Sequence, residues 1–278
     1  MVNYAALAAH GVSYAYSPGH WAVRNIHLAA PAGARIALLG ANGAGKSTLL
    51  LLLSGAEHVC HGEIYLKGSP AERSRAGMRR WRREVGLLLQ DPEDQLLAPT
   101  VEQDVAFGPL QDGVQEPEAR NLVEKALADM AISHLATRPV HELSLGEKKR
   151  VALAGLLVQT PSVLLLDEPT AGLDPGGVRA LREILDTLAA AGTAIILATH
   201  EVDFAYEWAA EVCVLFEGGI LARGEPAEVL ADRDMLTHAS LEPPLLLEAA
   251  LALGGRPPLP RSRAQFRQWA STTRRTVP

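Results

Sequence analysis

The 278 residues include 26 Lys and Arg against 32 Asp and Glu, which gives a formal net charge of -6, and 48% of the chain is hydrophobic. This composition excludes a disordered chain and supplies a core for one large domain or two modest ones. It also argues against nucleic acid as the main partner, because nucleic-acid-binding domains usually carry a basic surface. The two cysteines lack paired spacing, which predicts a protein of the reducing cytoplasm rather than one held by a disulfide framework. No apolar run is long enough to cross a bilayer, so any membrane role needs a partner.

The N-terminal part of the chain predicts a small antiparallel sheet. Two runs of strand-forming residues, 12–16 and 26–29, are separated by the turn-forming sequence Ser17-Pro18-Gly19. Further along, three short runs are apolar on both faces and flanked by turn residues, as is typical of central strands in a parallel sheet. These runs span residues 36–39, 163–166 and 194–197.

Helical spacing appears between and beyond these runs. Apolar residues recur from position 181 to 188 and are closed by Gly192, which predicts the helix of a βαβ unit. Residues 117–130 predict a second helix with acids near its start, and we assign it to an inserted helical subdomain of about residues 92–160. We expect one main domain over residues 1–232 and a C-terminal extension over residues 233–278. The leucines of this extension either support a dimer or pack within the chain.

A glycine-rich segment lies between the first apolar run and a helical run that starts at Thr48. Its glycines let backbone N–H groups turn inward around phosphate oxygens, and the helix N-terminus adds positive potential. In such a loop Lys46 reaches the terminal phosphates and the Ser47 hydroxyl coordinates Mg²⁺. The segment satisfies the P-loop pattern and predicts a nucleotide site made of Gly40, Ala41, Asn42, Gly43, Ala44, Gly45, Lys46, Ser47 and Thr48.

Two carboxylates, Asp167 and Glu168, follow the second apolar run, at the edge of a parallel sheet where ligands bind. Taken alone they indicate a solvated strand end, but the P-loop belongs at the same edge. We therefore expect Asp167 to hold Mg²⁺ and Glu168 to polarise the water that attacks the γ-phosphate. His200 closes the third run, where it can reach the γ-phosphate and that water. Together these residues predict hydrolysis of ATP to ADP and phosphate.

Residues 143–147, Leu-Ser-Leu-Gly-Glu, resemble the signature of the ATP-binding subunits of ABC transporters. The resemblance implies that the signature of one subunit closes over ATP held by the P-loop of another, with Ser144, Gly146 and Glu147 as ATP-contacting residues. The same residues predict an ordinary capping box, and both interpretations hold together. Leu145 and Glu147 depart from the usual glycine and glutamine, and a positive φ at Leu145 would cost about 1 kcal/mol or more.

The resemblance extends over residues 4–230 and assigns further roles by position. It implies that Tyr16 is the platform for adenine, although Tyr14 faces the same side of a strand and competes for that role. It implies that Gln90 senses Mg²⁺ and that residues 172–174 contact the opposite subunit. The implied fold is an α/β P-loop NTPase with a central, mostly parallel sheet, an N-terminal antiparallel β subdomain and an inserted helical subdomain. The implied cofactors are ATP and Mg²⁺.

Residues 89–109 resemble the energy-coupling-factor subfamily and, within it, the cobalt and nickel importer ATPases. This resemblance implies a peripheral subunit on the cytoplasmic face of the cell membrane that pairs with itself or with a paralogous ATPase. It also implies a transmembrane coupling protein gripped near Gln90, and a substrate-binding membrane subunit. The residues themselves indicate a turn at 91–92 and an apolar patch at 96–97, which suffice for a docking groove.

Other functions stay open beside this one. One alternative is the ATPase of an importer for a vitamin or another small solute. Another is a soluble ABC protein that acts on ribosomes or nucleic acid. Soluble relatives usually carry two cassettes or a long coiled coil, whereas this chain has one cassette and no heptad run. Glu168 and the signature argue against a third alternative, a P-loop kinase that transfers phosphate to a metabolite. Six arginines between residues 73 and 83 favour a solvated face over a contact with anionic lipid or with an acidic loop of a membrane partner.

Overall fold

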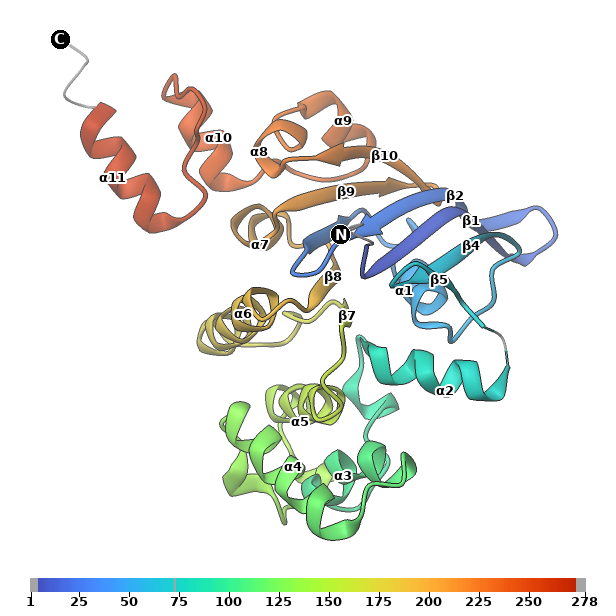
Figure 1. Cartoon of the computed structure of the whole chain (residues 1–278). Coiled ribbons are helices and arrows are strands. Elements are labelled where there is room, and N and C mark those ends of the chain that lie inside the picture. Colours follow the sequence, from blue (N-terminus) through green and yellow to red (C-terminus); the bar gives the residue numbers. More distant parts are fainter. Residues whose placement is uncertain (1–4, 73, 274–278) are drawn as a thin grey trace.

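The computed structural model describes residues 5–72 and 74–273, which form two sheets (Figure 1). The smaller sheet is antiparallel, with strand order β2-β1-β4-β5, and it confirms the sheet predicted at the N-terminus. Its first two strands are longer than predicted, because bulges let the pairing continue through residues that break the alternating pattern. The strands are β1 (Leu7–Ser17), β2 (His20–Ala30), β4 (His61–Leu66) and β5 (Ser69–Pro70).

The larger sheet has the strand order β10-β9-β3-β8-β7-β6. The strands from β9 to β6 pair in parallel, and β10 is antiparallel to β9. The three apolar runs predicted as central strands are β3, β7 and β8, so the α/β fold with a mostly parallel sheet is confirmed. The strands are β3 (Arg35–Leu39), β6 (Val85–Leu88), β7 (Val163–Asp167), β8 (Ala194–Thr199), β9 (Glu211–Phe216) and β10 (Gly219–Gly224).

Two apolar cores lie on opposite faces of the larger sheet. Alternate residues of a strand point to opposite faces, and along β3 Ile36 and Leu38 enter one core whereas Ala37 and Leu39 enter the other. The first core contains residues of both sheets and of α1 (Lys46–Ser54), the helix that follows the P-loop. The second core contains residues of α5 (Leu145–Leu157), α6 (Pro175–Ala190) and α7 (Val202–Trp208).

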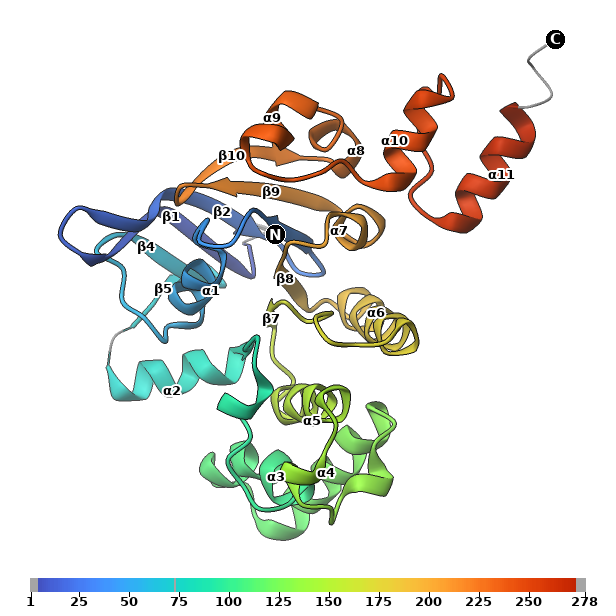
Figure 2. The ribbon, with the colours of Figure 1, turned by 180° about the vertical axis from the view of Figure 1, so that it is seen from behind.

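A helical lobe formed by α3, α4 and α5 lies below the sheets in both views (Figures 1 and 2). It confirms the inserted helical subdomain. The helix predicted at residues 117–130 is α4, which buries Ala119, Val123, Ala126 and Leu127. Besides α5, the elements here are α3 (Val101–Gln111), α4 (Glu116–Asp129) and 3₁₀ helices at Pro92–Asp94, Ser133–Leu135 and Val140–Glu142.

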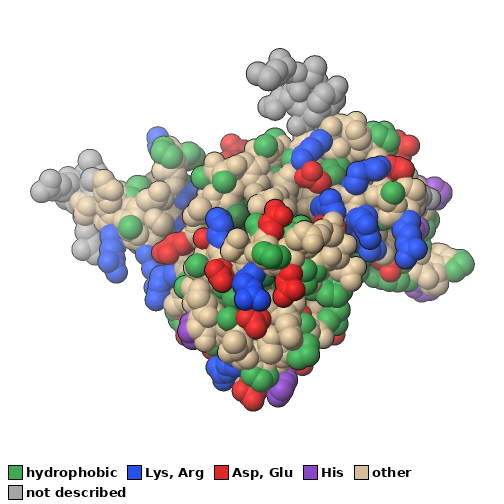
Figure 3. Space-filling model, turned by 60° about the horizontal axis from the view of Figure 1, so that its bottom comes forward, with side chains coloured by type: hydrophobic (Ala, Val, Ile, Leu, Met, Phe, Trp, Pro, Cys, Tyr) green, Lys and Arg blue, Asp and Glu red, His purple; other side chains and the backbone are tan. Residues whose placement is uncertain are grey.

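The predicted run of arginines lies on α2 (Arg75–Glu84), which precedes β6. This helix buries Trp81 against the protein and exposes its arginines to solvent. Figure 3 shows Lys and Arg side chains gathered on the side where α2 lies in Figure 1. Arg83 pairs with Asp112 at 2.6 Å. Arg73 lies outside the described residues.

The C-terminal helices pack partly on the second core and partly face solvent. Leu247 is fully buried in that core, whereas Leu245, Leu251 and Leu253 are exposed. The division of the chain at residue 232 and the dimer-supporting role of the extension stay predictions. No helix of the described residues is long and apolar enough to span a membrane. The helices are α8 (Pro226–Val229), α9 (Arg233–His238), α10 (Leu245–Ala252) and α11 (Arg263–Thr273).

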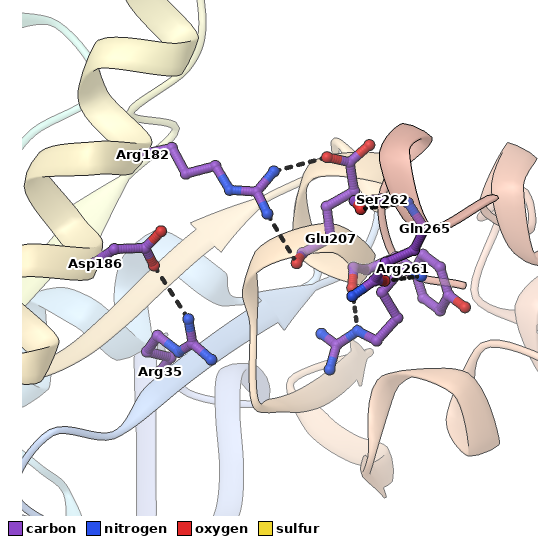
Figure 4. Close-up of polar contacts among 8 residues, drawn as sticks. Arg35, Arg182, Asp186, Glu207, Arg261, Ser262 and Gln265 are labelled. Atoms are coloured by element: carbon purple, nitrogen blue, oxygen red, sulfur yellow. Dashed lines mark hydrogen bonds and ion pairs between the residues drawn. The ribbon is translucent and has the colours of Figure 1, made fainter. Parts of the chain in front are cut away.

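Polar contacts attach this C-terminal region to α7 (Figure 4). The Nε atom of Arg261 donates to the carbonyl of Tyr206 at 2.8 Å, and its guanidinium also reaches the carbonyl of Ala209. These carbonyls lie at or near the end of α7, where helix carbonyls need outside donors. From the other side, Arg182 of α6 pairs with Glu207 of α7 at 2.7 Å. The short helix α7 is therefore held from two directions.

Candidate functional site

The P-loop connects β3 to α1 in a backbone conformation that requires glycine. Gly45 has a φ of 103°, and a Cβ there would lie 2.3 Å from the carbonyl oxygen of Ala22. A Cβ at Gly40 would likewise lie 2.6 Å from the carbonyl oxygen of Leu215. Gly45 is also the N-cap of α1, and no side chain in the described part of the chain caps that helix end. The first N–H groups of α1 are thus available to an anion, with the positive end of the helix dipole behind them.

Lys46, the first residue of α1, folds back over the loop. Its Nζ atom donates to the carbonyl oxygens of Gly40 at 2.7 Å and of Ala41 at 3.2 Å. Burial lowers the pKa of Lys46, while the carboxylates of Glu168 and Asp167 act in the opposite direction and favour its charged form. The ammonium is therefore held beside the loop that a phosphate would enter.

Asp167 ends β7, and one oxygen of its carboxylate has no partner among the described residues. Its Oδ1 atom is buried and accepts no hydrogen bond from the described residues. Burial raises the pKa of Asp167, and the nearby Ser47 hydroxyl acts in the opposite direction. An unpartnered carboxylate oxygen next to a hydroxyl is a donor set suited to a hard divalent cation. These residues therefore fit a magnesium ion held together with phosphate oxygens.

Glu168 is buried, and its carboxylate is held by residues at the end of the neighbouring strand. Thr199 donates from Oγ1 to Glu168 Oε2 at 2.9 Å, and His200 Nδ1 lies 2.9 Å from Glu168 Oε1. The backbone N–H of Glu168 donates to the carbonyl of Ala198 at 2.9 Å. The carboxylate is thus oriented for general-base chemistry, with the exposed imidazole of His200 beside it.

These elements surround one cleft of about 710 Å³. Predicted residues that line it are Tyr16, Asn42, Gly43, Gly45, Lys46, Ser47, Thr48, Gln90, Glu168 and His200. Gly40, Ala41, Ala44 and Asp167 do not line the cleft, but they belong to the P-loop and to the strand end next to it. The prediction missed five lining residues in the turn after β1 and the first half of β2, which are Gly19, His20, Trp21, Ala22 and Arg24. No local sequence pattern marks these residues, because their place in the lining depends on how the hairpin lies against the P-loop.

The two tyrosines of β1 take different partners. The Tyr16 hydroxyl forms a hydrogen bond with Thr48 Oγ1 at 2.9 Å, and Tyr16 remains 63% exposed at the cleft. Tyr14 instead donates to Glu57 Oε2 at 3.2 Å and does not line the cleft. The exposed ring at the P-loop is therefore that of Tyr16, which is the arrangement a stacking platform needs.

The signature residues form a second pocket, of about 530 Å³, whose lining shares no residue with the first. Ser144, Gly146 and Glu147 line it together with residues 172–174. Ser144 is the N-cap of α5, and its backbone N–H and hydroxyl both donate to Glu147 Oε2 at 2.8 Å. Leu145 lies in the first turn of α5 and has no positive φ, so the cost that a positive φ would carry does not apply.

Comparisons with known proteins agree with this geometry. A family model described as ABC transporter matches residues 23–171. The cobalt import ATP-binding protein CbiO of Rhodobacter capsulatus is 48% identical over 276 residues, covering 97% of this chain and 99% of that protein. The energy-coupling factor transporter ATP-binding protein EcfA of Methanocaldococcus jannaschii is 41% identical over 231 residues, covering 83% of each.

The likeness also holds in three dimensions. The solved structure of CbiO1 from Clostridium perfringens, described as part of the ABC transporter complex CbiONQ, is 40% identical to this chain. It superposes with a TM-score of 0.75 over 84% of this chain and 93% of that one. The resemblance read from the signature and from residues 89–109 is confirmed. The chain belongs to the ABC transporter family, as an ATP-binding and ATP-hydrolysing subunit of the energy-coupling-factor type.

Proposed function

We propose that two such subunits close on two ATP molecules, each lying between the P-loop cleft of one subunit and the signature pocket of the other. The observation that carries this proposal is the separation of the two pockets on one chain. The P-loop cleft contains the predicted catalytic residues, and the signature pocket contains a second helix N-terminus suited to phosphate. Each chain thus offers two complementary halves, and a second copy or a paralogous ATPase would complete both sites.

Within each site, Glu168 would accept the proton of the attacking water while His200 contacts the γ-phosphate. Thr199 and His200 orient the carboxylate of Glu168, as the hydrogen bonds at 2.9 Å support. Lys46 would pair with the terminal phosphates. Ser47, Gln90 and Asp167 would hold Mg²⁺, which neutralises charge on the phosphates when bound. Closure would be favoured while the γ-phosphate bridges the two subunits, and hydrolysis would remove that bridge.

The Glu168→Gln variant tests the catalytic assignment. We expect it to bind ATP and form the closed pair, but to hydrolyse ATP about 1,000-fold more slowly, because an amide cannot accept the proton. Phosphate release, nucleotide binding and dimer formation would be measured on the same preparation. Glu124→Gln, a matched change at an exposed position of α4, should leave all three unchanged. Turnover within a few fold of wild type would remove Glu168 from the catalytic role.

We further propose that the pair energises a membrane importer, with cobalt or nickel ions as the substrate. The likeness to a protein named for cobalt import supports this. Exposed apolar side chains in the helical lobe, among them Leu97 at 76% exposure and Phe107, offer a docking surface for a transmembrane coupling protein. The ATPase would then lie on the cytoplasmic face of the membrane, and a separate membrane subunit would bind the metal.

Purification of the tagged protein from native membranes in mild detergent tests this partner assignment. We expect mass spectrometry to find a coupling protein and a small metal-binding membrane subunit, after which uptake of cobalt and nickel can be assayed. Co-purification with a vitamin-binding membrane subunit would change the substrate. Recovery with ribosomes or nucleic acid would contradict the transport role while leaving the ATPase activity intact.

A further inference from the structure

Lys149 is a buried lysine of α5 that no role described above uses. It is 4% exposed and lies five residues after Ser144, the N-cap of the signature helix. Its Nζ atom donates to the carbonyl oxygens of Glu168 at 2.9 Å, Pro169 at 3.3 Å and Ala171 at 2.6 Å. An ammonium has three N–H donors, so all of its hydrogen-bonding capacity is directed at the turn that begins with Glu168.

That turn has an uncommon backbone conformation. Glu168 has a φ of +44°, in the left-handed region that costs a residue with a side chain roughly 1 kcal/mol or more. Such a conformation persists only where the surroundings determine it. The ammonium of Lys149 holds the carbonyl of Glu168, while Thr199 and His200 hold its carboxylate. Backbone and side chain of the same residue are therefore fixed from two different elements.

The contacts of Lys149 differ from those of a structural ion pair. Its hydrogen bonds go to carbonyl oxygens, and burial lowers its pKa, opposed by the more distant carboxylates of Glu168, Glu201 and Asp91. Burying an ammonium is costly, and well-packed apolar residues often stabilise a fold as well as a buried charge does. An apolar residue could fill the same space, but only the ammonium can donate three hydrogen bonds to the turn that bears Glu168.

We propose that Lys149 is a positioning residue that ties the turn bearing Glu168 to the helix that begins at Ser144. This inference rests on the proposed function, in which Glu168 acts on the ATP of its own subunit and the signature contacts the ATP of the partner. Lys149 then connects the two ATP sites. Because it lies on α5 and donates to the backbone carbonyl oxygen of Glu168, a shift of α5 moves the turn that orients the Glu168 side chain. Hydrolysis in one site thereby depends on how the signature helix is seated in the other.

The Lys149→Met variant tests the proposal, since it keeps the length of the side chain and removes all three donors. We expect kcat for ATP to fall about 100-fold, the effect of misplacing a catalytic group by roughly 1 Å, with KM and nucleotide affinity within about 3-fold of wild type. Lys125→Met, at an exposed lysine of α4, is the matched control and should leave kcat unchanged. A kcat within 3-fold of wild type, or a loss confined to nucleotide affinity, would overturn the proposal.

A second comparison separates positioning from a merely structural role. Lys149→Met added to Glu168→Gln should cause no further loss of hydrolysis, because the two residues act as one unit. A loss that multiplies with that of Glu168→Gln contradicts the inference. If Lys149→Met does not fold, Lys149→Gln, which keeps two N–H donors, replaces it in both measurements, with an expected loss of about 10-fold. Near-normal turnover by Glu168→Gln alone would instead reject the catalytic assignment, whatever the Lys149 variants do.

Discussion

The helices α1 and α5 both begin at a surface that we assign to ATP, but their N-termini are in opposite states. α1 follows Gly45, which has no side chain and leaves the first N–H groups of the helix uncapped. α5 follows Ser144, which forms a reciprocal capping box with Glu147. The orphan donors of one helix are open to a ligand, and those of the other are already partly satisfied by a carboxylate of the protein.

This difference explains why one surface can bind phosphate first and the other only later. The P-loop end can accept an anion without giving up a contact of its own. At the signature, the hydroxyl of Ser144 donates to Glu147, so a phosphate must displace that carboxylate or share its place. A free phosphate in solution would compete poorly. An ATP molecule already held by the P-loop of a second subunit arrives at high effective concentration, which favours the exchange.

The largest difference between the two helix ends should appear when Lys46, at the uncapped N-terminus of α1, is replaced. Lys46→Met removes the charged donor and should weaken ATP binding by the isolated chain about 10- to 100-fold, as the loss of one charge-assisted hydrogen bond implies. Calorimetric titration with ATP measures this. Lys125→Met is again the matched control. An affinity equal to that of wild type would mean that the open helix end binds the phosphates without the lysine.

A smaller effect is expected from replacing Ser144, which caps the N-terminus of α5. Ser144→Ala removes the N-cap of α5 and should lower stability by about 1 kcal/mol, or roughly 2–4 °C in Tm. ATP affinity of the isolated chain should stay within about 2-fold, because Ser144 does not line the P-loop cleft. ATP-dependent dimer formation should weaken. Loss of ATP binding by the isolated chain would show that the two surfaces are not independent.

Local patterns were sufficient to predict three central strands of the larger sheet, β3, β7 and β8, and most of the cleft at the P-loop. Short runs that are apolar on both faces predict buried parallel strands wherever they occur, and polar residues that follow such strands meet at one edge. The carboxylates Asp167 and Glu168 and the P-loop were therefore predictable without knowing any long-range contact. The part of the cleft lined by Trp21 and Arg24 was not predictable, because it depends on how the β1–β2 hairpin folds over the P-loop.

Residues whose role depends on distant contacts were beyond reach. Bulges along β1 decide which tyrosine faces the cleft, and Tyr14 and Tyr16 are equivalent in the alternating pattern. Lys149 is one of two adjacent lysines near the start of a helix, and only the packing of α5 on the turn at Glu168 distinguishes it from Lys148. Helix periodicity does not predict a buried charge, because burial of an ammonium is determined by acceptors elsewhere in the chain.

The smallest expected effect concerns Glu147 and depends on pH. The backbone N–H and hydroxyl of Ser144 hold the pKa of Glu147 below its ordinary value, aided by Arg138 and Arg150. A carboxyl with a lower pKa in the folded state stabilises the fold above its unfolded pKa, and this stabilisation is lost as pH falls through the folded pKa. Glu147→Gln lacks it, so wild type should exceed the variant by about 0.3–1 kcal/mol near neutral pH.

Urea unfolding of both proteins across the acid range measures that difference. It should shrink as pH falls below the ordinary carboxyl range and vanish once Glu147 is protonated. Glu124→Gln, in the middle of α4, should show no such trend. ATP-dependent pairing provides the opposite readout, because the neutral amide competes less with phosphate for Ser144. Glu147→Gln should therefore be less stable as a free chain and pair more tightly on ATP, and a change of the same sign in both measurements would refute the competition between capping and nucleotide.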